Sequence, residues 1–159
     1  MQTIVLMQTF SFTLVSLRWA SNIMVPAYML EDPSVKLVAT FVGYYNTLIN
    51  NIYSYRREVS AAMHEKGASK IAENIVNAVV HIMKERNVNE KEALKFVQEY
   101  LSQVEERFVD TVEKAKGHYS GENLETLERY TILLQNMCGG NITWSAISGR
   151  YNGSRERTE

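Results

Sequence analysis

Residues 50–58, with the sequence Asn-Asn-Ile-Tyr-Ser-Tyr-Arg-Arg-Glu, carry the side chains best suited to chemistry in this 159-residue chain. A helix turns about 100° per residue, so Asn50, Ser54 and Glu58 fall within roughly 80° of one another along one face. We refer to these three residues as the oxygen stripe. An amide oxygen, a hydroxyl and a carboxylate suit a hard divalent cation such as Mg2+. Arg57 lies on the same face, and its planar guanidinium matches phosphate oxygens.

The surroundings of the oxygen stripe decide whether it lines a cavity or faces solvent. Polar residues at helical spacing usually form a solvated face, which is the alternative interpretation. Two features favour a cavity wall. The small residues Ala39 and Gly43 lie upstream on the same face and leave space beside the helix. The opposite face carries an apolar ridge for packing, formed by Phe41, Leu48, Ile52 and Val59.

The segment from Asn50 to Glu58 resembles the second metal-binding motif of class I terpene synthases. That motif has Asn or Asp, then Ser or Thr four residues later, then Glu after four more. The Tyr-Ser-Tyr sequence at 53–55 is common in microbial-type members. The family usually has Asp directly after the first Asn, whereas this chain has Asn51. Position 51 points about 100° away from the stripe and is not normally a ligand, so the difference removes no metal contact.

A second group of side chains lies near the C-terminal end, where Trp144-Ser145 precedes Arg150-Tyr151. An arginine can hold a diphosphate through two parallel hydrogen bonds, and a tyrosine hydroxyl adds one donor. The pattern resembles the Trp-Ser…Arg-Tyr ending of microbial-type terpene synthases, in which the pair binds diphosphate. The resemblance thus extends from about Pro26 to Tyr151. It assigns the oxygen stripe to one Mg2+, and it assigns Arg57, Arg150 and Tyr151 to diphosphate binding.

Composition indicates a single soluble globular domain, with 45% hydrophobic and 22% charged residues. A net charge of −1 gives no electrostatic reason to expect nucleic acid or an anionic membrane as a partner. Cys138 is the only cysteine, so no intrachain disulfide can form and a cytoplasmic location is expected. Residues 1–17 lack the basic segment that begins a signal peptide, and they contain too many polar residues for a membrane span.

Long periodic segments and scarce proline predict an all-α chain, folded as an antiparallel helical bundle. We expect helices at about 3–21, 33–64, 70–86 and 89–116, and a last helix from 120–123 to Gly139-Gly140. Asp32 before proline, and Asn89 with Glu92, are helix-start signals, whereas a Gly-Gly pair favours a helix end. On the third helix, Asn74, Asn77 and His81 would form a second polar stripe, whose histidine is expected to be structural.

The aspartate-rich motif that forms the first metal site of class I terpene synthases has no counterpart here. The chain contains two aspartates, Asp32 and Asp110, which are far apart in sequence. The diphosphate-sensing arginine of the family would fall within about the first eight residues, and Met1 to Gln8 contain no arginine. Arg18 lies too close to the second helix to replace it. The resemblance implies a bundle around a deep apolar cavity, which needs a much longer chain. We therefore expect residues 1–151 to be the C-terminal portion of a terpene synthase catalytic domain and 152–159 a polar tail, so that this fragment alone is inactive.

The function implied by the resemblance is Mg2+-dependent ionisation and cyclisation of a prenyl diphosphate, such as farnesyl or geranyl diphosphate, with release of diphosphate. One alternative is a non-catalytic helical interaction protein, or an inactive relict, that uses its exposed half-core to bind a partner. Apart from the prenyl diphosphate, a second copy of the chain in a homodimer is the partner considered. A relative of the trans-prenyltransferases is nearly excluded, because that family depends on two aspartate-rich motifs.

Overall fold

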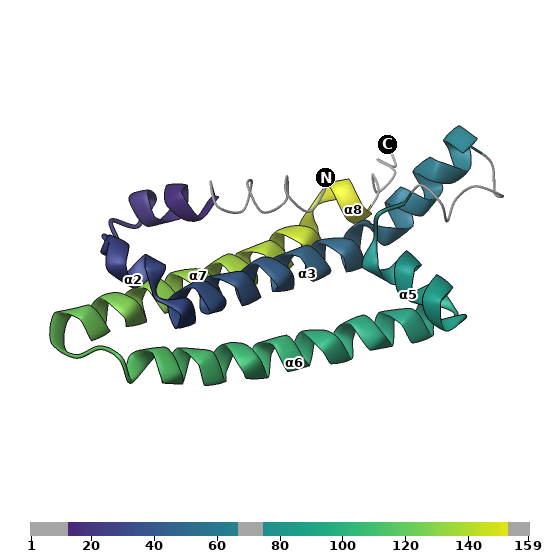
Figure 1. The fold of residues 1–159 in the computed structure, drawn as a ribbon. Coiled ribbons are helices and arrows are strands. Elements are labelled where there is room, and N and C mark those ends of the chain that lie inside the picture. Colours follow the sequence, from purple (N-terminus) through teal and green to yellow (C-terminus); the bar gives the residue numbers. More distant parts are fainter. Residues whose placement is uncertain (1–12, 67–74, 153–159) are drawn as a thin grey trace. The chain divides into compact units, whose positions relative to one another are not determined.

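The computed structural model describes residues 13–66 and 75–152, and within these ranges it contains helices and no strand. The prediction of an all-α chain is therefore confirmed. Residues 13–20 are helical. The remaining described helices are α2 (Ala27–Glu31), α3 (Pro33–Lys66), α5 (Ala78–Arg86), α6 (Glu90–Lys116), α7 (Gly121–Ile147) and α8 (Gly149–Asn152), shown in Figure 1. None of them combines the length and the apolar character needed to cross a membrane.

The chain forms two compact units. The first comprises Met1–Tyr45 and Val104–Gly139, and the second comprises Asn46–Gln103 and Gly140–Glu159. Each of the three long helices, α3, α6 and α7, therefore contributes residues to both units. In the first unit, a turn at 117–120 joins α6 to α7, so that these two helices run antiparallel (Figure 1).

The first unit has a continuous apolar core built from α2, α3, α6 and α7. The side chains of Met29, Ala115 and Leu134 are completely buried in it. Burial of this kind supplies most of the stability of such helices, because an isolated helix in water is marginal. The other members of the core are Ile23, Val35, Val38, Val42, Val112, Leu127 and Tyr130.

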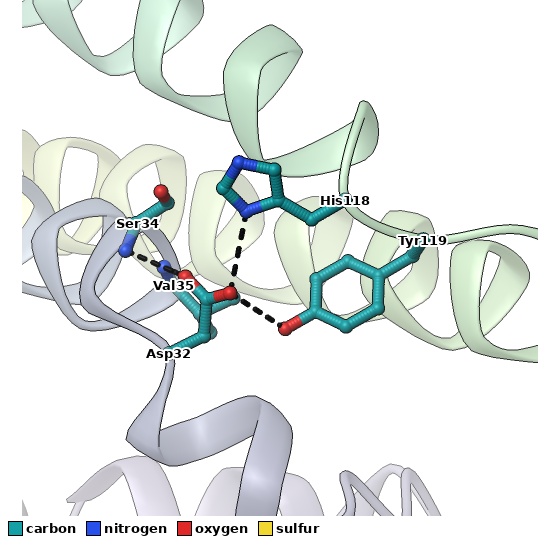
Figure 2. A network of polar contacts seen from close by, with 5 residues as sticks. All are labelled: Asp32, Ser34, Val35, His118 and Tyr119. Carbon is teal, nitrogen blue, oxygen red and sulfur yellow. Dashed lines mark hydrogen bonds and ion pairs between the residues drawn. The ribbon is translucent and has the colours of Figure 1, made fainter.

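Asp32 organises the start of α3, as the sequence predicts. Its Oδ1 accepts hydrogen bonds from the backbone N–H groups of Ser34 (2.7 Å) and Val35 (3.4 Å), so Asp32 is the N-cap. Figure 2 shows that Oδ2 faces the α6–α7 turn, where the Tyr119 hydroxyl donates to it at 3.0 Å and His118 Nδ1 lies 3.3 Å away. Partial burial opposes ionisation of this carboxyl, but the hydrogen bonds outweigh it and lower the pKa of Asp32.

Helix α6 begins at the predicted capping box. The Glu92 N–H donates to Asn89 Oδ1 at 3.0 Å, and the Asn89 N–H donates to Glu92 Oε2 at 3.1 Å. The periodic apolar residues that follow are packed as expected. Val97, Leu101, Val104 and Val112 are buried, and Leu94 and Phe108 are half-buried.

The third helix begins later than the sequence predicts, which removes the second polar stripe. Residues 75–77 are not helical, α5 starts at Ala78, and Asn74 lies outside the described residues. Asn77 is instead the N-cap, because its side chain accepts a hydrogen bond from the Val79 N–H at 2.9 Å. His81 is exposed and pairs with Glu85 at 3.1 Å, which agrees with the structural role expected for it.

Helix α7 does not end at Gly139-Gly140 but continues to Ile147. Each glycine costs the helix roughly 0.5–1 kcal/mol relative to alanine, which is too little to stop a helix that is packed beyond that point. Ser145 is completely buried, and the Asn141 side chain donates to the Asn46 carbonyl at 3.3 Å. The last turns of α7 are thus tied to α3 within the second unit.

The buried face of α3 is not the predicted apolar ridge. Phe41, Leu48, Ile52 and Val59 are all only half-buried. The fully buried apolar residues are Val35, Val38, Val42, Ile49 and Tyr55. The first four lie on a face that adjoins the oxygen stripe instead of opposing it, because their helical angles precede that of Asn50 by about 60–120°.

Candidate functional site

All six residues that the sequence assigns to metal and diphosphate binding lie in the second unit. Helix α3 is continuous from residue 50 to residue 58, which places the oxygen stripe on one face as its spacing predicts. The structure buries Ser54, whose side chain is 5% exposed, and leaves Asn50 and Glu58 half-buried. The stripe is therefore not a solvated face. Arg57 and Arg150, in contrast, are exposed.

The Ser54 hydroxyl is buried and makes no hydrogen bond among the described residues. A serine in a helix commonly satisfies its hydroxyl by donating to the carbonyl four residues earlier, as Thr131 does to Leu127 at 2.9 Å. An unpaired buried hydroxyl costs roughly 1–3 kcal/mol. The oxygen at the centre of the stripe is thus held out of water, without a partner in the part of the chain that the structure describes, between two half-buried oxygen-bearing side chains.

Tyr151 brings the C-terminal end of the described chain to the stripe. Its hydroxyl donates to Asn50 Oδ1 at 2.5 Å, across 101 residues of sequence. The Tyr151 ring meets the Trp144 ring edge-on at 5.5 Å and lies 6.4 Å from the Tyr53 ring. These aromatic contacts hold α8 against α7 and α3, and the hydroxyl fixes the Asn50 amide with its oxygen toward Tyr151. The Arg150 guanidinium lies 5.7 Å from the same ring and extends into solvent.

Glu58 is held by a residue that the sequence analysis did not assign to the site. The Asn77 side chain donates from Nδ2 to Glu58 Oε2 at 3.0 Å, and also to the Asn51 carbonyl at 2.9 Å. Asn51 completes the connection between α3 and α5, because its Oδ1 accepts from the Ala78 N–H at 2.6 Å. The available signal was the N-cap preference of asparagine before Ala78, which would have placed the start of α5 correctly.

Two adjacent arginines of α3 differ in their surroundings. The Arg56 guanidinium lies 3.5 Å from the Glu90 carboxylate, so its charge is partly neutralised. Arg57 has no ion pair or hydrogen bond with any residue that the structure describes. The structure thus brings Asn50 and Tyr151 into contact, and it shows no anionic partner for Arg57 or Arg150 among the residues it describes. Unpaired exposed guanidiniums remain available to an anionic ligand.

The oxygen stripe fits a hard divalent cation. The three donors are oxygens, and a bound cation would supply the partner that the Ser54 hydroxyl does not find among the described residues. Among residues 13–66 and 75–152 there is no cluster of three or more His, Cys, Asp or Glu side chains, so a site here depends on the amide and the hydroxyl as well. One carboxylate leaves a divalent ion with a net positive charge, which suits Mg2+ shared with substrate phosphates.

Comparison with known families identifies the family of this chain. Residues 7–107 match the family described as "Terpene synthase family 2, C-terminal metal binding". The chain belongs to this family. The matched range contains the oxygen stripe, Arg57 and Asn77, but it ends before α8. In this terpene synthase family 2 chain, the contact between Tyr151 and Asn50 therefore involves a residue that lies outside the matched range.

Three fungal proteins are similar to this chain. Ophiobolin F synthase of Cochliobolus heterostrophus is 29% identical over 71% of the chain and 14% of its own length. Preasperterpenoid A synthase of Talaromyces verruculosus is 29% identical over 66% of the chain and 13% of its own length. Sesquiterpene synthase 6 of Postia placenta is 23% identical over 86% of the chain and 36% of its own length. The chain thus spans between about an eighth and about a third of these relatives. No solved structure matches it.

Proposed function

We propose that this chain provides the second metal site of a class I terpene synthase, with residues 1–151 forming the C-terminal portion of the catalytic domain. Asn50, Ser54 and Glu58 would hold one Mg2+, while Arg57, Arg150 and Tyr151 would bind the diphosphate group of a prenyl diphosphate. The observation that carries the proposal is the buried Ser54 hydroxyl at the centre of the oxygen stripe, which has no hydrogen-bond partner among the described residues. A bound cation would remove the cost of that buried oxygen.

The side chains divide the work by charge. Glu58 supplies the single negative charge of the stripe, while Asn50 and Ser54 add neutral oxygens. Arg57 and Arg150 offer planar donors to the oxygens of the diphosphate, and these donors stabilise its charge as the bond to the prenyl carbon breaks. When bound, the divalent ion supplies further positive charge to the leaving diphosphate. No protein nucleophile is required for ionisation of an allylic diphosphate.

Tyr151 connects the two halves of the site. Its one hydroxyl proton is donated to Asn50 Oδ1, so the second lone pair of that oxygen stays available to a cation. The hydroxyl would donate to the diphosphate only by releasing Asn50, so with this bond in place the donors to the diphosphate are Arg57 and Arg150. We infer that Tyr151 orients the amide of Asn50 and brings Arg150 close to the diphosphate.

Metal binding tests the proposal directly. Titration of the purified chain with Mn2+ as a spectroscopic substitute for Mg2+, followed by electron paramagnetic resonance, should show one site per chain. Glu58→Gln should weaken that binding at least about 10-fold, because it removes the only charged ligand. The matched control is Glu106→Gln, an exposed position on α6, which should leave the affinity unchanged. Absence of Mn2+ binding, or equal binding by Glu58→Gln and wild type, would overturn the proposal.

Diphosphate binding and turnover are separate questions. With Mg2+ present, inorganic diphosphate should bind in a calorimetric titration, and Arg57→Ala should weaken it. Farnesyl diphosphate is the first substrate to assay by gas chromatography, since one relative is named a sesquiterpene synthase, and geranyl diphosphate is the second. Because the chain lacks an aspartate-rich motif, we expect diphosphate binding without turnover by this chain alone. Hydrocarbon product from the purified chain would contradict that expectation.

A further inference from the structure

We propose that Asn77 is a positioning residue for Glu58. Its side chain is 4% exposed, and each polar group of its amide is used. Oδ1 accepts from the Val79 N–H at 2.9 Å, while Nδ2 donates to the Asn51 carbonyl at 2.9 Å and to Glu58 Oε2 at 3.0 Å. The first two bonds fix the orientation of the amide, so its remaining N–H is directed at the carboxylate of Glu58.

The chemistry of this donor suits a metal ligand. An amide is neutral, so it orients the carboxylate without neutralising its charge. Glu58 has no cationic partner among the described residues, whereas Glu90 is paired with Arg56. The hydrogen bond engages Oε2 and leaves Oε1 without a protein partner in the described part of the chain. A carboxylate held in this way keeps its full negative charge and loses less side-chain freedom when a cation binds.

The position of Asn77 explains how the restraint is maintained. Asn77 is the N-cap of α5, and α5 is attached to the rest of the second unit at both ends. At its start, the Ala78 N–H donates to Asn51 Oδ1 of α3 at 2.6 Å. Toward its end, the Tyr55 hydroxyl of α3 contacts Met83 Sδ at 3.5 Å, and the Arg86 guanidinium lies over the Phe96 ring of α6 at 4.4 Å. The start of α5 is therefore fixed against α3 independently of Glu58. This inference rests on the proposed function, because it assigns Asn77 a role in the metal affinity of Glu58.

Two substitutions remove the donor but keep the helix cap. Asn77→Ser retains an N-cap oxygen and is neutral, while Asn77→Asp retains the cap and places a carboxylate against Glu58. Each variant should weaken Mn2+ binding roughly 10- to 100-fold, the range seen when outer hydrogen-bond partners of metal ligands are lost. Circular dichroism verifies that α-helical content is retained, and either folded variant suffices for the test.

A double-mutant comparison separates positioning from a merely structural role. In a Glu58→Gln background, Asn77→Ser should weaken Mn2+ binding no further, because the carboxylate that it positions is already gone. A purely structural effect of Asn77 would multiply with that of Glu58→Gln. The positioning role is overturned if Glu58→Gln weakens Mn2+ binding but Asn77→Ser and Asn77→Asp bind as wild type. It is also overturned if the losses caused by Glu58→Gln and Asn77→Ser multiply in the double mutant. In both cases the proposed metal site stands. If Glu58→Gln binds as wild type, both are overturned.

Discussion

Replacing Ser54 by alanine should stabilise the metal-free protein and weaken its metal binding at the same time. The hydroxyl is buried at 5% exposure and makes no hydrogen bond in the described structure. Its removal recovers part of the roughly 1–3 kcal/mol that an unpaired buried hydroxyl costs. Alanine also adds up to about 0.7 kcal/mol of helix propensity. Allowing for the small volume lost, we expect a net gain of about 1–2 kcal/mol in the free energy of unfolding.

The assay is thermal unfolding followed by circular dichroism, with chelator present to remove metal. For a chain of this size, each kcal/mol shifts the melting temperature by about 2–4 °C, so the midpoint should rise by about 2–8 °C. The Mn2+ affinity of the same variant should fall at least about 10-fold, because one of three ligands is lost. The two measurements therefore move in opposite directions, which loss of packing alone would not produce.

Ser102→Ala is the matched control. Ser102 lies within α6 in the same unit, but it is exposed and its hydroxyl donates to the Gln98 carbonyl at 3.4 Å. The Ser102→Ala variant should gain only the stability that the higher helix propensity of alanine supplies, and it should bind Mn2+ as wild type does. A Ser54→Ala protein that is less stable than wild type without metal would show that the hydroxyl is satisfied in solution. Unchanged Mn2+ affinity would remove Ser54 from the site.

Three further predictions follow from individual contacts. Because the pKa of Asp32 is lowered in the folded protein, the carboxylate contributes its full stability above the unfolded-state pKa of about 3.9, and this contribution is lost as pH falls through the folded-state pKa. Melting temperatures measured from pH 6 to pH 2 should therefore drop less steeply for Asp32→Asn than for wild type. Parallel curves would contradict this prediction. Gly139→Ala and Gly140→Ala should each raise the free energy of unfolding in urea by roughly 0.5–1 kcal/mol. Apart from the helix's own nearby backbone, neither added Cβ would meet an atom of the described residues within 4 Å. A loss of stability would show that the glycines are required. Tyr151→Phe keeps the ring but removes the hydroxyl that orients Asn50. The Mn2+ affinity of this variant, measured by electron paramagnetic resonance, should fall roughly 10-fold while its helical content stays unchanged. Wild-type affinity would exclude an orienting role for Tyr151.

The features that the sequence predicted correctly are those completed within a few residues. The cap at Asp32 and the capping box of Asn89 with Glu92 each need only the chemistry of one turn. The alignment of the oxygen stripe is equally local, because helical geometry alone sets the spacing of Asn50, Ser54 and Glu58. Long-range packing did not enter any of these predictions.

The features that the sequence missed depend on contacts that are distant along the chain. The Gly139-Gly140 pair weakens α7 locally, but burial of Ser145 beyond it keeps the helix intact. Asn77 reaches Glu58 across 19 residues of sequence, and Tyr151 reaches Asn50 across 101. Spacing along one helix can identify candidate ligands, but it gives no information about which side chains orient them.

Asn51, where the chain departs from the usual aspartate of the terpene synthase motif, fits this division between ligands and supports. Its Nδ2 donates to the Thr47 carbonyl at 2.7 Å while its Oδ1 accepts from the Ala78 N–H at 2.6 Å. An aspartate could accept the second bond but could not donate the first, and it would add a negative charge one residue from the stripe. Asparagine instead joins α3 to α5 without charge. Glu58 therefore remains the only carboxylate of the oxygen stripe, and two neutral amides, Asn51 and Asn77, secure the helix start that holds it.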